Sequence, residues 1–190
     1  MTLPAPRFLD RTTPPHLFTL VSLAAVSALS MNAFLPSLPG MAAWYGVDYR
    51  VMQLSVSLYL GVSAVLQLLI GPLSDRYGRR KVALGGLVLF CLASLGAVLA
   101  PTAESFLAFR MGQAVIASGM VLSRATARDM TDEAGAASML GYITMFMAVV
   151  PMLGPIAGGW LDETLGWQAN FAMLLVAGLL VLALVWADMG

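Results

Sequence analysis

A short charged stretch, residues 71–81, constrains the fold more than any other feature of this sequence. It reads GPLSDRYGRRK and lies between two apolar runs, 51–73 and 82–100, which are nearly free of charge. Apolar runs of about 20 residues are long enough to cross a bilayer as helices. The stretch is too short to be a domain, and Gly78 tolerates backbone angles that other residues resist. It therefore predicts a tight turn between two antiparallel membrane helices.

The charges of this turn predict its orientation and one of its contacts. Arg76, Arg79, Arg80 and Lys81 lie close together, and clustered cations of this kind favour the cytoplasmic side of a membrane. Asp75 falls at the end of the incoming helix, where the helix macrodipole disfavours an anion. Asp75 therefore needs a partner, which is either a nearby arginine or the N-terminus of another helix.

Composition extends this membrane reading to the whole chain. The 190 residues are 59% hydrophobic, which is more than a soluble domain of this size needs. We therefore expect the lipid bilayer to surround the protein. A net charge of zero gives no electrostatic support for nucleic acid as a partner. A single histidine, His16, and an isolated Cys91 provide no metal cluster or nucleophile with its base, so we expect no cofactor and no enzymatic activity.

Six apolar segments predict an all-α integral membrane protein. Residues 1–16 form a polar tail, which we expect to be cytoplasmic, and residues 17–190 form one bundle. Eight cations fall on the side of this tail and only Arg50 falls on the other, which predicts a cytoplasmic N-terminus in a bacterial-type inner membrane. The expected helices are 17–38, 51–73, 82–100, 106–128, 137–160 and 170–186.

The turn also carries a recognisable pattern. Its form, G-x-L-S-D-R-x-G-R-R-K, resembles the loop 2–3 signature of the major facilitator superfamily. The resemblance extends from about residue 17 to 186, and it implies the N-terminal half of a twelve-helix transporter, built as two inverted three-helix repeats. In that family the loop helps control opening on the cytoplasmic side. The implied gating residues of this loop are Gly71, Asp75, Arg76, Gly78, Arg79 and Arg80.

Asp129, at the end of the fourth predicted helix, is implied to belong to the same gating region. In the family, an acid at this position joins a charge cluster with the Asp and Arg of loop 2–3, here Asp75 and Arg79. Two alternatives stay open. The loop can serve as a topology signal only, and Asp129 can be a solvated loop acid.

Arg110 is the one charge well inside a predicted span. A charge at that depth is costly, so it usually faces a cavity or a partner. Arg110-x-x-Gln113 resembles the family's fourth-helix signature, with Ala114 where members commonly have Gly. The alternative is that Arg110 lies near enough to the start of its span, at Phe106, to snorkel to the outer interface.

The fifth predicted helix contains a proline and glycine pattern. Pro151, Gly154, Pro155 and Gly158 resemble the fifth-helix signature of the antiporter branch, although Val150 stands where a further Gly is usual. The prolines allow a bend, which implies a conformational role for the four residues. The alternative is a small-residue face for close helix packing.

The first predicted helix resembles that of the Bcr/CflA drug-resistance transporters. Those proteins typically carry an Asp where this chain has Asn32, and Asn does not titrate in this range. This departure puts proton coupling through the first helix in doubt. The resemblance implies export of small amphipathic drugs by antiport, from a cavity lined by the first, fourth and fifth helices. The candidate substrate-binding residues are Asn32, Phe34, Arg110, Gln113, Tyr142 and Met145.

Six spans make only half of such a transporter. We therefore expect the chain to associate with a second six-helix half or with another copy of itself. The alternative function is a truncated, non-transporting membrane subunit or partner protein. Whether a second half is encoded directly downstream discriminates between the two.

Overall fold

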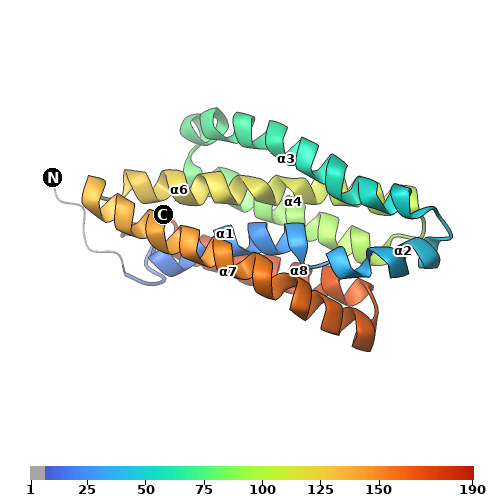
Figure 1. The fold of residues 1–190 in the computed structure, drawn as a ribbon. Coiled ribbons are helices and arrows are strands. Elements are labelled where there is room, and N and C mark those ends of the chain that lie inside the picture. The colour runs from blue at the N-terminus through green and yellow to red at the C-terminus, as the bar shows by residue number, and fades with distance from the viewer. Residues whose placement is uncertain (1–6) are drawn as a thin grey trace.

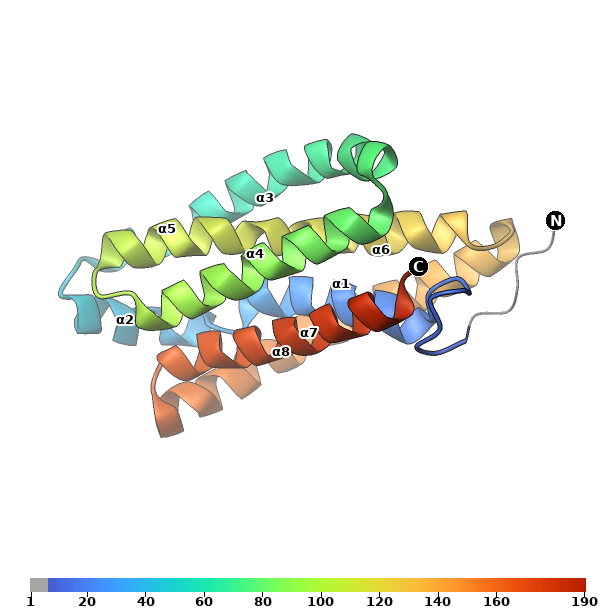
Figure 2. The same cartoon turned by 180° about the vertical axis from the view of Figure 1, so that it is seen from behind.

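A computed structural model describes residues 7–190, and every regular element in that range is a helix (Figures 1 and 2). The part of the predicted tail formed by residues 1–6 lies outside the described residues. Six helical segments are long and apolar enough to cross a membrane, which confirms the predicted all-α membrane fold. The elements in chain order are α1 (Leu17–Asn32), η1 (Leu35–Ser37), α2 (Leu38–Tyr45), α3 (Tyr49–Tyr77), α4 (Arg79–Leu99), α5 (Ala103–Gln113), η2 (Ala114–Ala117), α6 (Ser118–Asp129), α7 (Glu133–Leu165) and α8 (Gln168–Asp188).

The first and fourth segments each contain a short 3-10 interruption. We expected the first helix to end at residue 38, but the chain passes through η1, which contains Pro36, and resumes as α2, which ends at Tyr45. This continuation is possible because proline is tolerated in the first turn of a helix, where its missing N–H has no intrahelical partner. Gly46 ends α2 in the left-handed conformation, with φ of +64°. In the fourth segment, the 3-10 turn η2 joins α5 to α6.

Apart from the buried Arg110, the charged residues of the helices lie near the two ends of the bundle. At the first end, hydrogen bonds and ion pairs join the α3–α4 turn to the end of α6, and the end of α8 to the start of α1. At the other end, the Tyr45 hydroxyl donates a hydrogen bond to the carbonyl of Ala100, and Trp167 packs against Phe106. We call the first the basic end. It carries Arg7, Arg11, Arg76, Arg79, Arg80, Lys81, Arg124 and Arg128.

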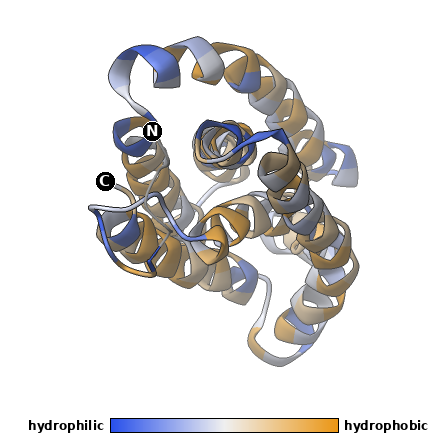
Figure 3. Ribbon diagram, turned by 90° about the vertical axis from the view of Figure 1, so that its left-hand side faces the viewer, coloured by the Kyte–Doolittle hydropathy of each residue, from blue (hydrophilic) through white to orange (hydrophobic). Residues whose placement is uncertain are grey.

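The helices are not equally buried. α4 packs along α8, and α1 packs against α6, α7 and α8, which places the core among these elements. α3 and α7 lie at opposite edges in Figure 1 and expose long apolar rows, including Leu68 and Leu69 on α3 and Met152 and Ile156 on α7. Seen from the basic end, hydrophobic positions continue along the helices (Figure 3). This surface suits lipid, and its two exposed helices suit a further helical partner.

Candidate functional site

Arg110 lies in the last turn of α5 and is completely buried, with 0% of its surface exposed. Its guanidinium donates from Nη2 to the carbonyl oxygen of Ser30 at 2.8 Å and from Nη1 to Oε1 of Gln113 at 2.8 Å. The Gln113 amide in turn donates to Oγ of Ser94 at 2.8 Å. This network ties α1, α4 and α5 together, and it pairs both terminal nitrogens of the buried cation, whereas Nε of Arg110 has no hydrogen-bond partner among the described residues.

Two aromatic rings cover the faces of the Arg110 guanidinium. Its central carbon lies 3.9 Å from the ring centroid of Tyr59 and 4.4 Å from that of Phe34. Both distances suit cation–π attraction, which is stronger away from water. The side chain therefore does not extend to the interface, and the snorkelling alternative is contradicted. Within residues 7–190, no carboxylate lies within ion-pairing distance of Arg110.

A cavity of about 220 Å³ lies beside this network, between α1, α3 and the η2–α6 segment. Tyr59 belongs to both, because it lines the cavity and stacks on Arg110. Ser63 and Gln67 line the same wall, and Met31 and Met120 contribute from the neighbouring helices. The Ser63 hydroxyl is buried and has no hydrogen-bond partner among the described residues. The cavity is thus lined by flexible apolar side chains and a few polar groups, which is the mixture of groups that lines small-molecule sites.

The structure brings together only some of the six candidate substrate-binding residues. Phe34 and Gln113 are fully buried and contact Arg110, and Asn32 is half-buried on α1, where its amide donates to the carbonyl of Ala28 at 3.0 Å. Tyr142 and Met145 are 50% and 52% exposed on α7. None of the six lines the cavity beside Tyr59.

We did not predict from the sequence that α3 lines a cavity. We assigned the substrate cavity to the first, fourth and fifth predicted helices and did not include the second, which corresponds to α3. A signal was present, because Tyr59, Ser63 and Gln67 recur every four residues and form a polar stripe on an apolar helix.

At the basic end, Arg79 joins the charged residues that were predicted to form a gating region. Its Nη2 lies 2.6 Å from Oδ1 of Asp75, and its Nε donates to Oδ2 of Asp129 at 3.1 Å. It also donates to Oγ of Ser74. The predicted need of Asp75 for a partner is met by this arginine. Because Arg79 bridges two carboxylates from different helices, it joins the α3–α4 turn to the end of α6.

The other gating candidates lie around this bridge. Gly78 connects α3 to α4 with φ of +91°, a conformation that favours glycine. The Arg76 guanidinium lies 5.5 Å from the Tyr77 ring, and Arg80 donates to the carbonyl of Trp186 at 3.1 Å. Gly71 has open space around the position of a Cβ.

On α7, Gly158 permits a close approach to the chain that follows α1. A Cβ at Gly158 would overlap the carbonyl oxygen of Ala33, and Asn170 donates to the Gly158 carbonyl at 3.1 Å. Gly154 is looser, with Leu29 at 3.4 Å from an added Cβ. Both prolines, Pro151 and Pro155, lie inside the continuous helix α7. The geometry at Gly158 fits the packing interpretation, and a conformational role for these residues stays a prediction.

These features define an integral membrane protein built as a six-helix bundle, with a buried arginine network and a charged turn at one end. Residues 20–188 match the sequence profile of the Major Facilitator Superfamily, and the chain belongs to this family. The family consists of membrane transporters, so the chain is not an enzyme.

Several known proteins are similar to this chain. A chloramphenicol resistance protein of Pseudomonas aeruginosa is 38% identical over 163 residues, which cover 85% of this chain and 39% of that protein. Multidrug resistance protein D of Escherichia coli (strain K12) is 34% identical over 161 residues, covering 84% of this chain and 41% of that protein. The crystal structure of a D-xylose-proton symporter matches with a TM-score of 0.70 and 18% identity, covering 90% of this chain and 47% of that one, which supports the shared fold alone. The chain thus spans about two fifths of the length of these curated relatives.

Proposed function

We propose that this chain acts as the N-terminal six-helix half of a transporter that exports small amphipathic drugs by antiport. The observation that carries the proposal is the cavity beside Tyr59, backed by the buried Arg110, in a chain similar to drug-resistance proteins. Drug accumulation tests it, in cells that express the chain with any downstream coding sequence. Accumulation that stays unchanged, although the protein is inserted in the membrane, would contradict export.

Substrate binding in this proposal uses the cavity and the surfaces next to it. Tyr59, Ser63 and Gln67 contact the drug from α3, and Arg110 holds Tyr59 in place through the ring contact. Tyr142 and Met145 are exposed on α7 and complete the wall once a second half packs beside it. The remaining candidates, Asn32, Phe34 and Gln113, support this wall from the core. The second half closes the site, as two bundles do around a midplane site in transporters of this kind.

The gating role in this proposal rests on the bridge between Asp75, Arg79 and Asp129. The bridge holds the α3–α4 turn against α6, and its rearrangement accompanies opening at the basic end. Arg79→Gln should uncouple the turn from α6 and alter transport, while the exposed Arg128→Gln should not. Equal transport by the two variants would contradict the role. We infer the same kind of role for Gly71, Arg76, Gly78 and Arg80 in the turn, and for Pro151, Gly154, Pro155 and Gly158 in α7.

We infer that the basic end is cytoplasmic, in a bacterial inner membrane, because eight cations lie there and Arg50 alone lies at the other end. Tyr77→Cys in a Cys91→Ser background tests this orientation in intact cells. An impermeant thiol reagent should leave the new cysteine unlabelled, and labelling would contradict the assignment.

The coupling ion is a separate part of the proposal. The acids of the described helices lie near helix ends, and Asn32 occupies the place where Bcr/CflA proteins carry an Asp. We therefore infer that a proton-coupling carboxylate, if export uses one, comes from the second half. Asn32→Asp should then add a pH dependence to export in the acid range, and an unchanged pH profile would contradict this inference.

A second candidate function is a membrane subunit that does not itself transport. The observation that favours it is the exposed apolar surface of α3 and α7, which can bind another helical protein. If no second half is encoded or recruited, the exposed faces of α3 and α7 would serve to bind a partner instead.

A further inference from the structure

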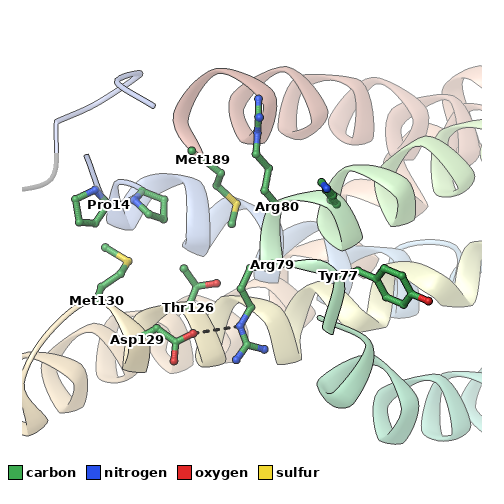
Figure 4. Close-up of a pocket in the computed structure, with 12 residues that line it drawn as sticks. Pro14, Tyr77, Arg79, Arg80, Thr126, Asp129, Met130 and Met189 are labelled. Carbon is green, nitrogen blue, oxygen red and sulfur yellow. Dashed lines mark hydrogen bonds and ion pairs between the residues drawn. The ribbon is translucent and has the colours of Figure 1, made fainter. Parts of the chain in front are cut away.

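A second cavity, of about 510 Å³, lies at the basic end of the bundle (Figure 4). It is an open cavity lined by the α3–α4 turn and the start of α4, the end of α6, the residues at the end of α8 and the segment that precedes α1. Arg79, Arg80 and Lys81 line it from α4, and Thr126 and Asp129 line it from α6. The cavity is separate from the one beside Tyr59. It borders the proposed gating bridge between Arg79 and Asp129, but the drug site proposed above does not include it.

Two polar groups at this cavity lack partners. Thr126 lines the cavity and is only 6% exposed, and its hydroxyl oxygen has no hydrogen-bond partner among residues 7–190. In Figure 4 it lies between Arg79 and Met130. Nε of Arg80 is also buried without a partner in the same range, although Nη2 of this residue donates to the Trp186 carbonyl. Buried donors of this kind are normally paired, so these two indicate a missing acceptor.

The positive charge that lines the cavity also favours binding of an anion. The first residues of α4 are Arg79, Arg80 and Lys81, and Gly78 provides no side-chain cap. The first amides of a helix lack intrahelical partners, and they form the positive end of the helix macrodipole. Three cations at this position therefore repel the positive end of the macrodipole and repel one another. Asp129 is the one side-chain carboxylate among the lining residues, and it is paired with Arg79. The positive charges of Arg80 and Lys81 have no carboxylate partner among the described residues.

We propose that this cavity binds a phosphate-bearing anion. The Thr126 hydroxyl, the Arg80 guanidinium and the amides at the start of α4 supply the donors, an arrangement that suits phosphate oxygens. Pro14, Pro15 and Met189 form an apolar part of the wall, which suits the glycerol region of a phospholipid. Basic pockets between membrane helices recognise anionic headgroups through the same chemistry. A lipid headgroup and free phosphate are therefore the two sources to distinguish.

The test uses the purified chain in detergent, with two probes in separate titrations. One probe is short-chain phosphatidylglycerol, with zwitterionic phosphatidylcholine as its counterpart of zero net charge, and the other is inorganic phosphate. Native mass spectrometry and thermal shift report binding. Preferential binding of phosphatidylglycerol identifies a lipid site, and binding of phosphate at submillimolar concentration identifies a free-anion site.

Variants link this binding to the cavity. Thr126→Val keeps the side-chain shape and removes the hydroxyl, and Arg80→Gln removes the charge; each should weaken binding by about tenfold. Arg128→Gln is the matched control, because Arg128 is exposed on the same helix as Thr126 and does not line the cavity. If Arg80→Gln fails to fold, Thr126→Val decides. Binding of neither probe, or equal binding by Thr126→Val and Arg128→Gln, would overturn the proposal.

Discussion

The backbone amide of His16 donates a hydrogen bond of 2.7 Å to Oδ2 of Asp188, which lies 172 residues away. The same carboxylate accepts from the amide of Leu9 and the hydroxyl of Thr19, each at 2.7 Å, and Asp188 is fully buried. The Arg11 guanidinium adds a contact, since it lies 4.0 Å from the Trp186 ring centroid. The last turn of α8 therefore fastens the segment before α1 to the bundle.

Replacing Asp188 should release this segment. Asp188→Asn keeps the size but loses the charge and one acceptor, so we expect a loss of about 1–3 kcal/mol in the free energy of unfolding. Hydrogen exchange of residues 7–16 should rise with it. The matched control is Glu163→Gln, an exposed acid at the opposite end, which should change neither quantity. Unchanged exchange in Asp188→Asn would show that the carboxylate does not hold the segment.

Arg110→Ala should destabilise the bundle as well as impair transport. The change leaves the Ser30 carbonyl and the Gln113 side chain without their partner and empties the space between Phe34 and Tyr59. We expect a cost of about 2–4 kcal/mol, measured by denaturant unfolding in detergent. Arg110→Lys should recover only part of this, because an ammonium group lacks the planar fork that bonds and stacks here. Wild-type stability in Arg110→Ala would contradict the network.

Two glycines on α7 offer a matched pair. A Cβ at Gly158 meets the carbonyl of Ala33, whereas one at Gly141 meets nothing within 4 Å. Gly158→Ala should therefore destabilise the protein by about 1–3 kcal/mol, because helix backbones must separate. Gly141→Ala should be neutral or stabilising by up to about 1 kcal/mol, because alanine favours a helix. Thermal unfolding of both variants checks this, and equal melting temperatures would contradict the close contact.

Local patterns predicted most of the fold. The lengths of the apolar runs predicted the six membrane spans. The position of Asp75 at a helix end predicted a partner for its carboxylate, which the structure identifies as Arg79. These features depend on residues close together in sequence. The burial of Asp188 could not be predicted this way, because it depends on the N-terminal segment folding back across the bundle. The predicted sixth span accordingly ended at 186, whereas α8 continues to Asp188.

The cavity beside Tyr59 could be predicted only with knowledge of which face of each helix turns inward. The charge of Arg110 and the resemblance of its surroundings to the family signature predicted a cavity-facing residue, and snorkelling to the interface was the alternative. The ring contact of Arg110 with Tyr59 was not predictable, because it depends on the rotation of α3 about its own axis. The polar stripe on α3 carried the information, but only packing shows that it meets α1 and α6 rather than lipid or a partner.

Filling the cavity beside Tyr59 should reduce drug binding without unfolding the protein. Ser63→Leu places a larger apolar side chain in a space of about 220 Å³ and removes an unpaired hydroxyl, so stability should be kept or raised. Ser57→Leu is the control, since Ser57 is exposed on the same helix. Fluorescent drug binding to the assembled transporter measures the effect, which should be at least about tenfold for a blocked pocket. Equal affinity of the two variants would place the drug site elsewhere.

Transport by the isolated chain tests the central claim most directly. Alternating access needs two bundles that move against each other around a central site, and this chain forms one bundle with exposed α3 and α7 faces. Purified chain is sized by a mass-sensitive method and then reconstituted in liposomes for drug uptake, alone and with a second six-helix half. The account predicts that a monomer carries no drug and that uptake appears only when two bundles assemble. A stable monomer that carries drug across the liposome membrane would contradict it.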